Sequence, residues 1–160
     1  MSRSKKISKV LTAMDPVFGN RLVTKLINKS MRDGKKAAAA TQVYRALEIV
    51  KEKQPDTDAS KYLDVVINTI APKMEVRPRR VGGASYQVPM EVRGDRKTHL
   101  ALKWLIEAAR GRSNKEYHTY AEKLAAEMMD ATQGLGGAIK KRDMVYKMAE
   151  ANRAFAHLKW

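Results

Sequence analysis

Most of the chain carries apolar residues at the spacing of an amphipathic α-helix. Positions i, i+3, i+4 and i+7 are apolar in several successive stretches, separated by Gly, Pro and short polar runs. The pattern predicts three helices within residues 19–72, the first over about 20–32 and the second over about 36–52. It predicts three more within residues 94–150.

Polar residues at the expected helix starts suggest where each helix begins. Asn20 is a good N-cap for the first helix, and Asp58 is one of three candidates, with residues 56 and 57, for the third. We expect Asp95 to cap the fourth helix. The sequence Ser113-Asn114-Lys115-Glu116 has the pattern of a capping box and predicts the start of the fifth.

Residues 73–93 follow a different period. Apolar residues there recur at every second position on both sides of Gly82-Gly83, which predicts two strands joined by a tight turn. Pro78 and Pro89 cannot donate backbone hydrogen bonds, so neither strand is expected inside a wide sheet. The prediction is a two-stranded antiparallel β-ribbon that protrudes between the third and fourth helices.

Two registers are open to this ribbon. A two-residue turn at Gly82-Gly83 would place Arg77 opposite Val88 and mix apolar and charged side chains on one face. A three-residue loop over residues 81–83 would place Val76 opposite Val88 and separate the two faces. On this argument we favour the three-residue loop.

These elements define a mainly α fold. Residues 1–160 are expected to form a single domain of about six helices with one protruding ribbon. Residues 1–18 would be a basic N-terminal arm without fixed structure in the free protein, and residues 151–160 a basic C-terminal tail.

Charge points to a polyanionic partner. The 160 residues include 32 Lys and Arg against 17 Asp and Glu, a formal net charge of +15. The basic excess is concentrated in residues 1–36, 73–97 and 132–160, whereas residues 37–72 and 98–131 are nearly neutral. This distribution resembles a neutral scaffold with basic contact elements, as in proteins that bind nucleic acids.

Residues in the N-terminal part can be assigned to phosphate contacts on charge alone. In the first predicted helix the basic side chains recur at steps of three or four and form one stripe. The candidates are Arg3, Lys5, Lys6 and Lys9 in the arm, Lys25, Lys29 and Arg32 in the stripe, and Lys35 and Lys36 after it.

No motif for catalysis or cofactor binding is present. The chain has no cysteine, and its histidines, His99, His118 and His157, are scattered without metal-ligand spacing. The glycine-rich stretches lack the context of nucleotide-binding loops, and no apolar run is long enough to cross a bilayer. We therefore expect no enzyme, metal, cofactor, small-molecule substrate or membrane association.

Three functions remain: a binder of structured RNA, an architectural DNA-binding protein with its Arg-rich ribbon in the minor groove, and a basic protein-interaction scaffold. DNA-bending ribbon proteins usually act as dimers with paired arms. This chain has one ribbon and asymmetric basic blocks, which favours RNA.

Two long motifs resemble one protein family. Residues 79–93, RRVGGASYQVPMEVR, resemble the signature of the small ribosomal subunit protein seven family, and residues 148–157, MAEANRAFAH, resemble the carboxyl end of its bacterial and organellar members. Shorter motifs, including Asp33-Gly34-Lys35-Lys36 and Lys140-Lys141-Arg142, occur in the same order along the chain as in that family. The resemblance covers essentially the whole chain.

The resemblance implies six helices with a β-ribbon between the third and fourth. It also implies a primary binder of the 3′ major domain of small-subunit rRNA, in the subunit head, on a cytoplasmic or an organellar ribosome. Its ribbon would reach exit-site tRNA and the mRNA path. Neighbouring head proteins, and protein eleven at the platform, would be partners.

The resemblance also carries residue roles. The residues placed near tRNA and mRNA are Arg77, Arg79, Arg80, Gly82, Gly83 and Tyr86. The residues placed at the ribbon base, and expected to meet rRNA, are Arg93, Arg96 and Lys97. Further rRNA contacts are implied for Lys35, Lys36, Lys140, Lys141, Arg142 and Arg153.

Overall fold

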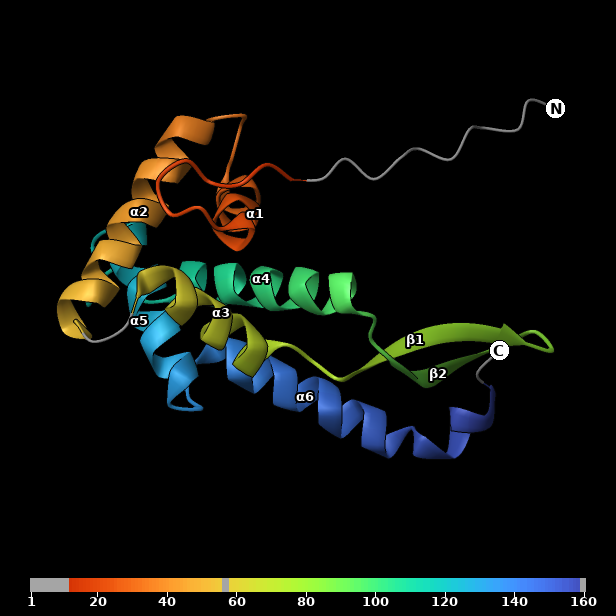
Figure 1. The fold of residues 1–160 in the computed structure, drawn as a ribbon. Helices are drawn as coiled ribbons and strands as arrows, with labels where there is room; N and C mark the ends of the chain where they lie inside the picture. Colours follow the sequence, from red (N-terminus) through yellow and green to blue (C-terminus); the bar gives the residue numbers. More distant parts are fainter. Residues whose placement is uncertain (1–11, 56–57, 159–160) are drawn as a thin grey trace, which may run out of the picture.

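The structure, a computed structural model, describes residues 12–55 and 58–158. In this part of the chain six α-helices, one two-stranded ribbon and one short 3-10 helix follow each other (Figure 1). The elements are α1 (Arg21–Ser30), α2 (Lys36–Lys53), α3 (Ala59–Ile70), β1 (Met74–Val81), β2 (Ala84–Glu91), α4 (Gly94–Gly111), α5 (Tyr120–Thr132), α6 (Gly137–Ala151) and η1 (Arg153–Leu158). The predicted mainly α fold, with its ribbon between the third and fourth helices, is confirmed.

Two of the predicted helix caps are present. The Asn20 side chain accepts a hydrogen bond from the backbone N–H of Leu22 at 2.7 Å, and Asp58 accepts one from Ser60 at 3.0 Å. Both side chains satisfy N–H groups that have no partner within the helix, which explains why α1 and α3 begin there.

The predicted N-cap of α4 and the predicted start of α5 are wrong. Arg93 occupies the N-cap position of α4, and Asp95 lies inside its first turn. The helix α5 begins at Tyr120, where Thr119 and Glu122 form a capping box. The pattern Thr-x-x-Glu at 119–122 competes with Ser-x-x-Glu at 113–116. The earlier pattern instead forms a local turn, in which Ser113 Oγ accepts from the N–H of Lys115.

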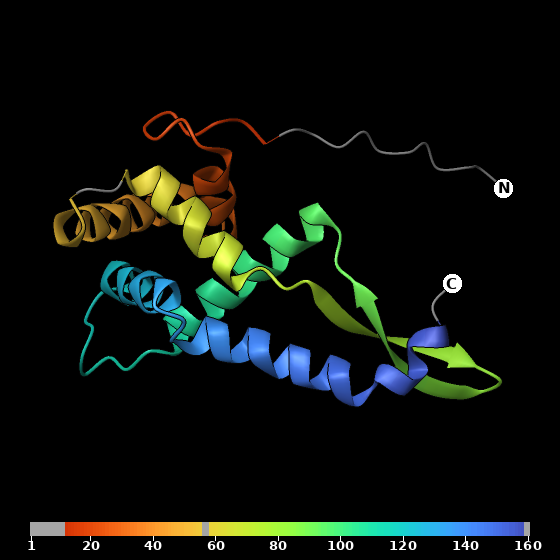
Figure 2. The same ribbon diagram turned by 60° about the horizontal axis from the view of Figure 1, so that its bottom comes forward.

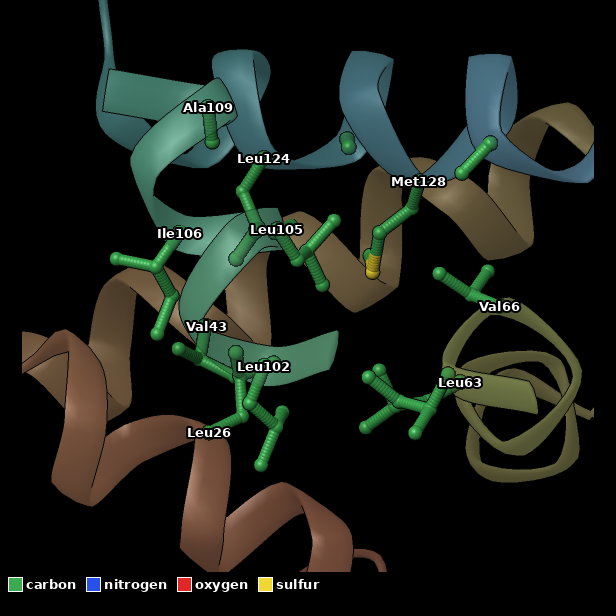
Figure 3. Packing of buried hydrophobic residues seen from close by; sticks show 14 of the residues in the cluster. Leu26, Val43, Leu63, Val66, Leu102, Leu105, Ile106, Ala109, Leu124 and Met128 are labelled. Carbon is green, nitrogen blue, oxygen red and sulfur yellow. The ribbon is translucent and has the colours of Figure 1, made fainter. Parts of the chain in front are cut away.

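The hydrophobic core lies where the six α-helices meet. Figure 3 shows Leu26 of α1, Leu63 of α3, Leu105 of α4 and Leu124 of α5 pointing into one cluster, and each of these side chains is fully buried. Helix α4 is central to this arrangement because it contacts α1, α3, α5 and α6. Burying these apolar side chains supplies most of the stability of the helical body.

The ribbon has the two-residue turn, so the predicted three-residue loop is wrong. Arg77 lies opposite Val88, and the turn consists of Gly82 and Gly83. Both glycines have positive φ, 55° and 91°, which is the backbone that matches the twist of a two-residue hairpin and that other residues rarely adopt. The mixed face is tolerated because Arg77 pairs with Glu75 on its own strand while Val88 is buried.

The ribbon projects away from the helical body, and the end of α6 and η1 lie beside it in both views (Figures 1 and 2). The rings of Tyr86 in β2 and Phe155 in η1 are 5.2 Å apart. Residues 153–158 of the predicted C-terminal tail thus form η1, which packs against β2 through this aromatic pair.

The N-terminal arm also needs correction for the residues that the structure describes. Asp15 is 4% exposed, accepts hydrogen bonds from the backbone of Val17 and Phe18, and accepts one from the hydroxyl of Tyr44 at 2.7 Å. These bonds attach residues 15–18 to α2. Arg3, Lys5, Lys6 and Lys9 lie outside the described residues. In the part of the chain that is described, no helix combines the length and apolar character that a membrane span needs.

Candidate nucleic-acid interface

The basic stripe of α1 faces the first half of α4. Lys25 and Lys29 lie on α1, together with Arg21, while Arg32 follows the helix in the connection to α2. The Nζ of Lys29 donates to the carbonyl oxygen of His99 in α4 at 3.0 Å. Lys29 is therefore held against a second helix, whereas Arg21 and Arg32 at the two ends of the stripe are exposed.

Positive charge is crowded between these two helices. Burial, followed by the nearby charge of Lys103, lowers the pKa of Lys29. Burial, followed by the charge of Lys29, lowers the pKa of His99. Both shifts have the direction produced by a positive local potential, which a bound phosphate would reduce.

The ribbon base is organised by one buried carboxylate. Glu75 is 6% exposed and forms ion pairs with Arg77 in β1 and Arg96 in α4, the latter at 3.2 Å. Each guanidinium remains about half exposed, at 50% and 47%. Glu75 thus orients the side chains of Arg77 and Arg96, two predicted contact residues. Arg93 and Lys97, the other predicted residues of the ribbon base, are close to Arg96 in the sequence.

The tip of the ribbon presents Arg80 and the two turn glycines to solvent, whereas Arg79 is half-buried. Tyr86, also predicted to lie near tRNA and mRNA, is half-buried against Phe155. Its ring therefore helps to join the ribbon to η1.

The three basic residues at the start of α6 do not act as one group. Lys140 and Lys141 are exposed. Arg142 is 23% exposed, donates to the carbonyl oxygen of Thr69 at 2.7 Å and pairs with Asp143 at 2.8 Å. The structure therefore gives Arg142 a role in joining α6 to α3. Arg153 is exposed at the start of η1.

A second buried carboxylate, that of Glu127, positions the start of α6. Glu127 of α5 is 1% exposed, accepts from the N–H of Ala138 at 2.9 Å and pairs with Arg112 at 2.7 Å. A side chain at Gly136 would collide with it, since a Cβ there would lie 2.7 Å from Glu127 Oε1. Glu127 thereby holds the turn that presents Lys140 and Lys141.

One basic cleft was missed by the sequence analysis. It has a volume of about 460 Å³ and lies between the α1–α2 connection, the start of α2 and the α4–α5 connection. Arg32 and Lys35 were predicted contacts, but Arg110 and Lys123, which also line the cleft, were not. Sequence gave no signal for them, because they lie in a nearly neutral block and the fold brings them to the cleft.

The exposed basic side chains thus occupy several separate elements: α1, the start of α4, the ribbon, the start of α6, η1 and the cleft. Among the residues that the structure describes, no group of three or more His, Cys, Asp or Glu could hold a metal ion. Such an arrangement suits one large anionic surface contacted at many points.

Comparison with known proteins gives matches along the whole chain. The model of the family described as Ribosomal protein S7p/S5e matches residues 2–153. The small ribosomal subunit protein uS7 of Carboxydothermus hydrogenoformans is 51% identical over 146 residues, 91% of each chain. The proteins of the same name from Caldicellulosiruptor saccharolyticus and Streptococcus agalactiae are 50% and 48% identical over 160 residues, all of both chains.

Proposed function

The chain belongs to the Ribosomal protein S7p/S5e family, and from that premise we propose that it organises the 3′ major domain of small-subunit rRNA, which forms the subunit head. As a family member it is a structural constituent of the small ribosomal subunit and not an enzyme. Its contribution is to bind several RNA segments at once and hold them in one arrangement.

The observation that supports this proposal most strongly is the distribution of exposed cations. They lie on separate elements around a neutral helical core, so each can meet a different stretch of RNA. Contacts of this kind read the shape and phosphate spacing of folded RNA, because side chains cannot enter the narrow major groove of an A-form helix.

The ribbon is proposed to reach exit-site tRNA and the mRNA path. Arg79, Arg80 and the Gly82-Gly83 turn lie at the end that projects beyond the helices (Figure 1). Other head proteins, and protein eleven at the platform, are the proposed protein neighbours. The bacterial relatives favour a cytoplasmic ribosome over an organellar one.

Salt-dependent affinity tests the proposal. The full chain would be titrated with the isolated 3′ major domain, with an unrelated structured RNA of equal length, and with duplex DNA. If it neutralises about six to ten phosphates, affinity falls by orders of magnitude between 50 and 200 mM salt. We expect the rRNA domain to remain the tightest ligand throughout. Equal affinities that fall together with salt would contradict the proposal, and tighter binding to DNA would favour an architectural DNA-binding protein.

A further inference from the structure

The basic cleft is assembled from four parts of the fold. The end of α1 and the following connection form one wall, and the first turns of α2 form a second. The end of α4 and the segment that leads into α5 close it. The lining residues are Ser30, Arg32, Lys35, Ala38, Ala39, Gln42, Arg110, Asn114, His118, Tyr120 and Lys123.

All the charged side chains that line the cleft are basic. The lining contains the cations Arg32, Lys35, Arg110 and Lys123, and it contains no Asp or Glu. The remaining polar residues are hydroxyl, amide and imidazole groups. A cavity with four cations and no carboxylate around it favours an anionic occupant.

Lys123 is the least expected of these cations. It is 8% exposed, although lysine is rarely buried unless it is paired with a carboxylate. Its Nζ donates to the carbonyl oxygen of Arg112 at 2.7 Å and to the side-chain oxygen of Asn114, both of them neutral. An ammonium has three N–H donors, so these two bonds leave one for a ligand in the cleft.

The start of α2 adds a second source of positive potential. Its N-cap residue is Lys35, which makes no side-chain capping bond, and its first turn has no acidic residue. Ala38 and Ala39 of this helix line the cleft. With Lys35 and Gln42 they place one face of α2 along the cleft, close to the positive end of the helix dipole.

Two further contacts hold the opposite wall in place. Arg110 donates from Nη2 to the carbonyl oxygen of Ser30 at 3.0 Å, and the hydroxyls of Ser30 and Tyr120 are 3.0 Å apart. These contacts connect α1, α4 and α5 around the cavity. The cationic groups of Arg110 and Lys123 are therefore held in place before any ligand binds, which lowers the cost of binding.

We propose that this cleft holds a backbone phosphate of the bound RNA, contacted by Lys123 inside and by Arg32, Lys35 and Arg110 at the exposed side. This inference rests on the proposed rRNA-binding function and adds a discrete phosphate site to it. The alternative source of the same chemistry is free inorganic phosphate.

The main test compares two single variants of the full chain. Arg110→Gln removes a charge from the cleft, and Lys61→Gln removes one from the exposed face of α3. With the isolated 3′ major domain, Arg110→Gln should lower affinity about tenfold and reduce the salt slope by about one, whereas Lys61→Gln should do neither. Arg110→Lys retains the charge and should restore the slope. Urea unfolding of each variant shows that the helical body is intact.

A second measurement separates the two sources of phosphate. Amide NMR signals of Ala38 and Ala39 would be followed while inorganic phosphate, and separately a short RNA from the 3′ major domain, is added to the free protein. RNA is expected to shift both signals at concentrations far below those that inorganic phosphate requires. Lys123→Met is the negative control, because it lacks one cation of the cleft: at the RNA concentrations that shift both signals in the wild-type chain, neither signal should shift in this variant.

Failure of this inference is distinguishable from failure of the proposed function. If the wild-type chain prefers the rRNA domain but Arg110→Gln binds it as Lys61→Gln does, the cleft is not an RNA phosphate site and the function stands. If inorganic phosphate shifts Ala38 and Ala39 and RNA does not, the cleft binds free phosphate and the inference is overturned. If the wild-type chain shows no preference for the rRNA domain, the proposed function fails first.

Discussion

The helical body and the ribbon are stabilised in different ways. The body buries apolar side chains from six helices in one cluster, with Leu26, Leu63 and Leu105 fully enclosed (Figure 3). The ribbon has only two strands, which alone would be marginal in water. Its position depends on a small number of contacts with α4, α6 and η1. We therefore expect core packing to fix the position of the proposed RNA-contacting side chains on the body. Those on the ribbon depend on individual anchoring contacts.

Three anchors can be named. Glu75 connects β1 to Arg96 of α4, the hydroxyl of Tyr146 in α6 accepts from the backbone N–H of Lys73 at 2.9 Å, and Phe155 packs on Tyr86. Each is a local contact on a partly exposed surface. Losing one should therefore loosen the ribbon without unfolding the helices.

The largest effect is expected in the core of the body. Leu105→Ala removes a fully buried side chain of the central helix and should lower the free energy of unfolding by about 3 kcal/mol. Urea denaturation measures this change. A loss below about 1 kcal/mol would contradict the view that packing around α4 dominates stability.

A similar loss is expected when the buried ion pair of the body is broken. Glu127→Gln leaves Arg112 paired only with the partly exposed Asp130, and we expect a cost of about 2 kcal/mol. The exposed pair of Lys103 and Glu107 provides the control, since Glu107→Gln should change stability by less than about 1 kcal/mol. Equal effects of the two substitutions would argue against a supporting role for Glu127.

A smaller global effect is expected at the ribbon. Phe155→Ala should reduce unfolding free energy by about 1 kcal/mol while hydrogen exchange in β1 and β2 becomes faster. Hydrogen exchange in α4 and α5 should not change. His157→Ala, a substitution at an exposed residue of η1, serves as the control and should leave exchange in the strands and the helices unaltered. Unchanged exchange in the strands of Phe155→Ala would show that η1 does not position the ribbon.

At the ribbon tip the expected stability change is smaller still. The double variant Arg79→Ala with Arg80→Ala should alter unfolding free energy by less than about 1 kcal/mol. Ribosomes that carry it should have altered exit-site tRNA occupancy or reading-frame maintenance. Wild-type values of both would count against a tRNA or mRNA role for the ribbon.

The attachment of residues 15–18 to α2 can be followed by pH. The hydrogen bond to Asp15, followed by burial, raises the pKa of Tyr44 from 10.0 to about 12. The protonated phenol is the form that the fold stabilises, so this contribution is complete below pH 10 and is lost as pH rises towards about 12. Absorbance of tyrosinate should show a titration near pH 12 that Tyr44→Phe removes and that Asp15→Asn moves to lower pH. A Tyr44 titration near 10 would contradict the contact.

The fold was predictable because each helix contributes a clear apolar stripe. Asn20 and Asp58 cap their helices as expected, and residues 73–93 form the expected ribbon. The ribbon register was not predictable from alternation alone. Alternation favoured the three-residue loop, which separates apolar from charged side chains. The backbone preference of Gly82-Gly83 instead gives the two-residue turn. The ion pair between Arg77 and Glu75 makes the resulting mixed face acceptable.

The candidate interface was predictable only where basic residues cluster in sequence. The stripe of α1 could be found in this way. Arg110 and Lys123 could not. Arg110 bonds to Ser30, 80 residues earlier in the chain, and both residues line the cleft only because the fold brings them to the start of α2. Arg142 shows the opposite case: it lies in a basic run, yet it contacts the carbonyl oxygen of Thr69 and helps to hold α6 on α3.

The central claim is that RNA contacts the basic elements, namely α1, the starts of α2, α4 and α6, and the ribbon. The end of α2 and the exposed face of α3 should remain free of RNA. Lysine acetylation of the full chain, with and without the 3′ major domain, tests it directly by mass spectrometry. We expect bound RNA to protect Lys25, Lys35, Lys97, Lys140 and Lys141. We expect no protection of the exposed lysines of α2 and α3, Lys51, Lys53 and Lys61. Uniform protection of both groups, or protection of the second alone, would contradict the account.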